Sequence, residues 1–348
     1  MKYIFQNFKL RKLYIFFLFL ALFNIFFSTS NVQANTFSIN DIEISTPFEI
    51  NFNKNNIIDQ GFIEVFNELI LSIVKTRDQK KLKQTSLSKI KGMIETFSIN
   101  EEKFIDEIYY LNLNVSFSKK KVFDLLESNN VFPSLPTKKN IFFIPIIFDQ
   151  NKNEILMFSE NYLFNNWNFN NKKYHLLNYI LPTEDLEDFN LIKMKSKSLE
   201  NYDFQEIISK YNLEDYIITV IFKNDQEIRV LNKIYFNGTI ELKNLKFKNL
   251  RLDKNNISNQ LIEKLKTLYE NHWKSKNQIN TSVKLSLTIS VGNNNNLKIL
   301  EFEEILKNTD LVYDFYIYKF DNKNNIYKII FNGSPGSFLN IMNKNNYK

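Results

Sequence analysis

The sequence predicts an α+β protein made of two or three small modules, each an antiparallel or mixed sheet with helices packed mainly on one face. Segments with apolar residues at every second position alternate along the chain with segments whose apolar residues recur every three or four positions. The clearest strand also alternates apolar with polar residues, which is typical of an antiparallel sheet with one buried face. Strands and helices interleaved in this way favour several small layered units over one large domain.

The first 34 residues have the order of a secretory signal peptide. A basic start without acidic residues precedes the apolar run Leu13–Phe27, and Ala34 offers the small residue at which a signal peptidase cuts. The run is shorter than the roughly 20 residues of a membrane-spanning helix. We therefore expect a periplasmic protein cleaved after Ala34, with an uncleaved N-terminal anchor as the alternative. No cysteine follows the run, so we expect no lipid-anchored form.

Charge and composition narrow the class of partner. The chain carries a formal charge of +7, but the signal contributes four basic residues and no acidic one, which leaves +3 on residues 35–348. So small a charge on a chain of this length is not typical of nucleic-acid binding. The chain has no cysteine, so disulfides and thiolate metal sites are ruled out, and we predict neither a metal site nor a cofactor.

The first unit is predicted over residues 35–150. Its longest helix carries one wide apolar stripe, and its clearest strand alternates from Leu111 to Phe117. In order, we expect a strand over 41–52, a helix from the Asn55–Asn56 cap to about Thr76, a helix over 87–97, a strand over 111–117, a helix after Ser118 and a buried strand over 141–148.

The middle unit is predicted over residues 151–278. The dipeptide Asn237-Gly238 divides a strand-rich segment and is a strong signal for a hairpin. In order, we expect strands over 179–181 and 216–223, with a helix over 203–210 between them, then the hairpin within 228–250 and a helix over 256–271.

The last unit, residues 279–348, is small. Its predicted order is strand, helix, strand, strand, helix, which is a compact α+β module. The elements are a strand over 283–291, a helix over 302–307, strands over 311–320 and 325–331, and a helix from Ser337.

An acidic segment is the best candidate for a cation or solute site. Glu184, Asp185, Glu187 and Asp188 place four carboxylates within five residues, and carboxylate oxygens are ligands for calcium. The segment lacks the spacing of a helix–loop–helix calcium site. The alternative is a solvated loop with acidic residues near the start of an element.

An aromatic patch centred on Trp167 is the second candidate for binding. Asparagines surround its rings, as in surfaces that bind sugars or proteins. The simpler interpretation is a loop that inserts these rings into the core. No catalytic constellation accompanies the patch: His175 and His272 lie far apart in sequence, and no serine occupies the Gly-x-Ser-x-Gly motif of hydrolases.

Several segments carry a resemblance to a known group of proteins. They are Leu111–Phe117 followed by Val122–Leu126, the strand Ile141–Phe148, Trp167 with Leu181–Asp188, Trp273-Lys274, and Tyr327–Gly333 in the tail. Together they resemble an uncharacterised family of exported proteobacterial proteins known only as a domain of unknown function. The resemblance implies periplasmic α+β modules similar to the N-terminal modules of periplasmic assembly proteins, and it brings no catalytic residues.

The expected function is that of an exported cell-envelope protein without catalytic activity, a scaffold or accessory protein that binds a protein partner through a sheet edge or a groove. The alternative is an envelope enzyme or solute binder that uses Trp167 and the acidic segment 184–188, which requires those side chains to meet in one pocket. No nucleic-acid partner is expected, and contact with a membrane is expected only through an uncleaved N-terminal segment.

Overall fold

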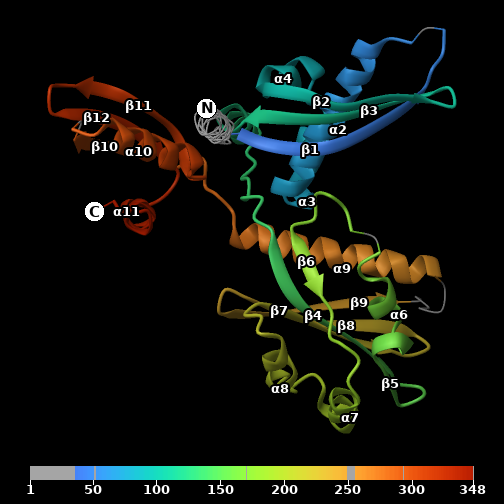
Figure 1. Ribbon diagram of the computed structural model, residues 1–348. Coiled ribbons are helices and arrows are strands. Elements are labelled where there is room, and N and C mark those ends of the chain that lie inside the picture. Colours follow the sequence, from blue (N-terminus) through green and yellow to red (C-terminus); the bar gives the residue numbers. More distant parts are fainter. Residues whose placement is uncertain (1–35, 51, 170, 249–254, 293, 348) are drawn as a thin grey trace, which may run out of the picture.

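The computed structural model describes residues 36–50, 52–169, 171–248, 255–292 and 294–347 (Figure 1). The predicted signal peptide, residues 1–34, lies outside the described residues. The fold is α+β and contains three separate sheets with their helices, as the sequence predicts.

The first sheet has the strand order β1-β3-β2, and both of its pairings are antiparallel. Its helices share one face with the apolar side chains of the strands, in a core built around Leu113, Val115 and Phe66. The elements are β1 (Thr36–Pro47), α2 (Lys54–Ile73), α3 (Thr76–Gln79), α4 (Leu87–Met93), β2 (Ile94–Ile105), β3 (Ile108–Ser118) and α5 (Lys119–Ser128).

Two predictions for this unit were wrong. The helix expected over 87–97 ends at Met93, and the chain continues directly into β2, which the sequence analysis did not predict. Most β2 side chains are exposed, so the strand has no clear alternation of buried and exposed residues. The strand over 141–148 was assigned to this unit, but it pairs with strands of the middle sheet, so the boundary between the two sheets precedes residue 139 and not residue 151.

The middle sheet has six strands in the order β5-β4-β7-β8-β9, with β6 parallel to the start of β4. The hairpin predicted at Asn237-Gly238 joins β8 to β9. The elements are β4 (Lys139–Asp149), β5 (Glu154–Leu156), α6 (Tyr162–Asn166), β6 (Leu177–Ile180), α7 (Leu186–Met194), α8 (Gln205–Ile208), β7 (Tyr216–Lys223), β8 (Glu227–Phe236), β9 (Thr239–Lys248) and α9 (Asn255–Lys276).

Helices cover both faces of this sheet, which explains its continuous apolar strands. Along β4, Ile141 and Phe143 pack towards α9 and α6, whereas Phe142 and Ile144 pack with the core on the side of α7 and α8. A strand buried on both faces loses the apolar–polar alternation and becomes a run of large apolar residues.

The C-terminal module has the strand order β10-β12-β11, and all of its pairings are antiparallel. Its core lies between the sheet and two helices and contains Phe302, Tyr327 and Phe331. The elements are β10 (Leu285–Gly292), α10 (Asn296–Asn308), β11 (Val312–Phe320), β12 (Asn324–Phe331) and α11 (Pro335–Lys344).

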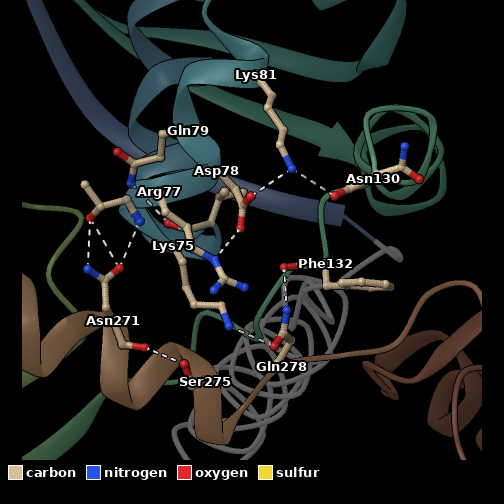
Figure 2. A network of polar contacts seen from close by, with 12 residues as sticks. Lys75, Arg77, Asp78, Gln79, Lys81, Asn130, Phe132, Asn271, Ser275 and Gln278 are labelled. Atoms are coloured by element: carbon tan, nitrogen blue, oxygen red, sulfur yellow. Dashed lines mark hydrogen bonds and ion pairs between the residues drawn. The ribbon is translucent and has the colours of Figure 1, made fainter.

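Polar contacts join the first unit to the middle unit where the last turns of α9 meet the end of α2. Figure 2 shows the Asn271 side chain beside the start of α3, where its Oδ1 accepts a hydrogen bond from the backbone N–H of Thr76 at 2.9 Å. Lys75 donates to Gln278 at 2.9 Å, and the Leu135 backbone N–H donates to the Asn277 carbonyl at 3.1 Å. These contacts fix helix α9 against the first unit (Figure 1).

Lysines at the start of α5 join the first unit to the C-terminal module. Lys119 is nearly buried and pairs with Asp310 at 2.6 Å, and Lys120 pairs with Asp314 at 2.5 Å. The Tyr313 hydroxyl donates to Asp124 on the same helix. This lysine run therefore serves contacts within the protein.

Candidate functional site

The acidic segment forms the N-terminus of helix α7. Asp185 is the N-cap, and its side chain accepts hydrogen bonds from the backbone N–H groups of Glu187 at 2.8 Å and of Asp188 at 3.4 Å. Asp185 thereby satisfies donors that the first turn of a helix leaves unpaired, and the neighbouring acidic residues lie at the positive end of the helix dipole. The N-cap and the helix dipole therefore account for the acidic residues of this segment.

The four carboxylates of this segment point to different partners. Asp185 and the buried Asp188 both bind the Lys210 ammonium group, at 2.9 and 2.6 Å, while Glu184 accepts from the backbone N–H of Ser159 at 3.1 Å. Glu187 is exposed to solvent. Hydrogen bonds from Lys210 and from the helix N-terminus lower the pKa of Asp185. In the described part of the chain, no group of three or more metal-ligating side chains is placed to hold an ion.

Trp167 lies on the other face of the middle sheet and is fully buried. Its ring packs against Phe143, at a centroid distance of 4.0 Å, and against Tyr179 and Tyr269 in the core beneath α9. The acidic segment belongs to α7, whose Phe189 packs on the opposite core. The structure therefore does not bring Trp167 and the acidic segment together, and the simpler interpretation of the aromatic patch, insertion into the core, fits Trp167.

A ladder of buried ionisable residues runs along α9, and the sequence analysis did not identify it. Lys266, Glu270 and Lys274 follow one another at four-residue spacing, so their side chains lie on one face of the helix, and all three are buried. In the sequence they can be recognised as charged residues at every fourth position within an apolar stripe.

The ladder binds polar groups of neighbouring segments. The Glu270 carboxylate accepts from the backbone N–H groups of Leu176 and Leu177, and the Lys274 ammonium group donates to the carbonyls of Leu71 and Val74 at the end of α2. Lys266 donates to Asn171 at 2.8 Å. Glu270 and Lys274 therefore satisfy backbone groups at the start of β6 and at the end of α2, which positions both segments on α9.

Burial shifts the pKa values of the ladder and of His175 beside it. Burial lowers the pKa of Lys266 and that of Lys274 to about 8, and it raises the pKa of Glu270. Burial and the positive charges of Lys266, Lys274 and Lys172 lower the pKa of His175 to about 4. The neutral His175 ring accepts a hydrogen bond at Nδ1 from the backbone N–H of Lys172 at 3.3 Å. Shifted pKa values often mark catalytic sites, but structural networks produce them too, and here the ladder binds backbone groups.

Strand β9 provides a different kind of site, an edge with which no further strand pairs among the described residues. It is the last strand of the six-stranded sheet and pairs with β8 over ten residues without a register shift, from Glu227↔Lys248 to Phe236↔Thr239. Ile240 and Leu242 are 59% and 61% exposed on one face of the strand, while Leu245 and Phe247 lie half-buried against α9 on the other.

Each of the other strand edges lacks at least one of the features that β9 combines. Strands β1, β2 and β11 contain register shifts, and bulges of this kind twist or interrupt an edge. Strand β5 has only three residues and β6 only four. Strand β10 is regular, but unlike β9 it carries no exposed large apolar side chain. Among the described strands, β9 thus combines length, regularity and exposed apolar side chains.

No family model matches the chain, and no curated protein matches it. Within the described residues, no helix has both the length and the apolar character needed to cross a membrane.

Proposed function

We propose that this chain is an exported, non-catalytic protein of the bacterial cell envelope that binds a protein partner by strand addition at β9. The signal-like sequence of residues 1–34 supports export. The regular ten-residue edge of β9 is the observation that carries the binding mode. An edge strand presents a row of backbone N–H and C=O groups that an extended segment of another chain pairs with.

The arrangement of the ionisable residues supports a binding role rather than a catalytic one. On α9, Glu270 and Lys274 engage backbone groups and Lys266 engages the Asn171 side chain, while Asp185 and Asp188 engage Lys210. A general acid or base must reach a bound substrate. In this protein the most strongly perturbed groups hold segments of the fold in place.

A fractionation experiment tests export. The full chain is expressed in its own cells or in a related bacterium, and the periplasmic fraction is separated. We expect the protein in this fraction, with an N-terminus at Asn35 by Edman degradation. Recovery of the unprocessed chain in the cytoplasm would overturn this part of the proposal.

A pair of surface variants tests the binding mode. The double variant Ile240→Asp/Leu242→Asp places two charges on the exposed face of β9 and disfavours an added strand. The control Leu300→Asp changes a side chain that is equally exposed, at 61%, but lies on α10. After crosslinking in the envelope, we expect the wild type and Leu300→Asp to retain the same partner, and the β9 variant to lose it while keeping its melting temperature. Equal retention by all three proteins would rule out β9 as the binding edge.

A further inference from the structure

Strand β9 carries more basic than acidic residues, and its basic residues are unevenly distributed along the strand. The strand carries three lysines, Lys243, Lys246 and Lys248, against one acidic residue, Glu241. Glu241 already lies beside two ammonium groups, those of Lys276 at 3.0 Å and Lys243 at 3.3 Å, and beside the His272 ring at 3.5 Å, whose pKa burial lowers. Hydrogen bonding to Lys276 lowers the pKa of Glu241, in spite of an opposing effect of burial. The single carboxylate of the strand is therefore neutralised from within the protein.

The open face of β9, which carries Ile240 and Leu242, is apolar in its first half and basic in its second half. Ile240 and Leu242 occupy the first half of the strand, and Lys246 and Lys248 occupy the second half on the same face, because side chains alternate along a strand. Lys246 pairs with Glu227 at 2.6 Å, whereas Lys248 has no carboxylate partner among the described residues. An added strand at this edge would thus meet apolar side chains at one end and ammonium groups at the other.

The face of the strand that packs towards α9 adds further positive charge. Lys264 lies over the Phe247 ring at 5.1 Å from its centroid, and it too has no carboxylate partner among the described residues. Lys276 donates to the Thr239 hydroxyl at 3.2 Å as well as to Glu241. Cations therefore flank the β9 edge on both of its faces.

We infer that the partner at β9 is an extended acidic segment of another protein, with apolar residues where it passes Ile240 and Leu242 and carboxylates where it passes Lys246 and Lys248. The inference rests on the proposed strand addition and adds the chemistry of the partner. Opposite charges on neighbouring strands stabilise their pairing, and like charges oppose it. A basic segment would bring its cations against the lysines of β9, so this edge selects against it.

The absence of cysteine from the chain allows a direct test by disulfide capture. Asn244→Cys places one thiol at the centre of the open face of β9, between its apolar and basic halves. The probes are two ten-residue peptides, each with a central cysteine and alternating apolar residues; one carries glutamates in the polar positions and the other carries lysines. The fraction of the full chain captured by each peptide is measured at equilibrium in a thiol–disulfide buffer. Amide hydrogen exchange then records protection of β9.

The matched control site is Thr288→Cys on β10. This strand is also a regular edge, Thr288 is also exposed, and the segment Leu285–Gly292 contains no charged residue. At Asn244→Cys we expect the acidic peptide to be captured about tenfold more strongly than the basic one at low ionic strength, with the preference shrinking as salt screens the charges. At Thr288→Cys we expect no comparable preference for the acidic peptide.

The outcomes separate the inference from the function on which it rests. If both peptides protect the amides of β9 and are captured equally, strand addition stands and the acidic selectivity is refuted. If neither peptide protects the amides of β9, both proposals fail. In the Asn244→Cys protein, the further change Lys246→Ser/Lys248→Ser is expected to abolish the preference and to leave amide protection in place. Persistence of the preference in that variant would also overturn the inference.

Discussion

The carboxylate of Glu270 accepts a hydrogen bond from the backbone N–H of Leu177 at 2.9 Å, across 93 residues of sequence. Its two oxygens also accept from the preceding N–H, at 3.0 and 3.1 Å. We predict that Glu270→Ala lowers the free energy of unfolding by about 2–3 kcal/mol, because two buried N–H groups lose their acceptor. Urea unfolding measures this loss. The control Glu263→Ala, at a less buried position on α9, is expected to stay within about 0.5 kcal/mol of the wild type.

Helix α2 packs closely against the first sheet at Gly61. A Cβ atom placed there would lie 2.4 Å from Leu113 Cδ1 and 2.5 Å from Ile44 Cδ1, both in the core. We predict that Gly61→Ala destabilises the protein by about 1–2 kcal/mol, since overpacking outweighs the gain in helix propensity. The matched change Gly92→Ala in α4 meets no atom within 4 Å and is expected to stabilise by about 0.5 kcal/mol. Thermal unfolding of the two variants compares them, and equal effects would contradict the close approach.

His175 gives the protein a stability that depends on pH. Its folded-state pKa of about 4 lies below the unfolded value of 6.5, so between these values the unfolded chain binds a proton that the folded chain does not. The free energy of unfolding therefore falls as the pH drops from about 6.5 to 4. Because the ring is only partly buried, we expect a contribution on the order of 1 kcal/mol.

The variant His175→Asn isolates this contribution from that of the carboxylates, which titrate over the same range. We predict a flatter pH profile for the variant than for the wild type between pH 6.5 and 4, measured by urea unfolding at several pH values. Identical profiles would show that the imidazole titrates alike in the folded and unfolded states.

Local patterns in the sequence account for most of the fold. The hairpin at Asn237-Gly238 and the apolar stripe of α2 appear where their spacing predicts them, because turn chemistry and helical periodicity act within a few residues. The placement of β4 depends on which distant strands it pairs with. The local sequence of a buried strand does not indicate which sheet the strand joins. The segment 141–148 was therefore assigned to the neighbouring unit.

The site residues differ in how far the sequence reveals them. The sequence places the acidic residues near the start of an element but predicts no helix over Leu186–Met194, which Asp185 caps in the structure. The partner of the buried Asp188, Lys210, lies beyond any local pattern. The edge position of β9 is likewise a property of the assembled sheet. Strands β8 and β9 form one hairpin, and β9 is the edge strand because β7 pairs with β8.

Lys210 tests whether the acidic segment is structural or a cation site. The hydrogen bonds that Lys210 donates to the carboxylates of Asp188 and Asp185 raise the pKa of Lys210, so its charge persists at neutral pH. We predict that Lys210→Met lowers the melting temperature by leaving the buried Asp188 carboxylate without its cation, and that adding Asp188→Leu restores much of the loss. We also expect millimolar calcium to leave the melting temperature of the wild type unchanged, because these carboxylates already bind an ammonium group and the helix N-terminus. A calcium-dependent rise that disappears in Asp185→Ala would instead support the cation-binding alternative.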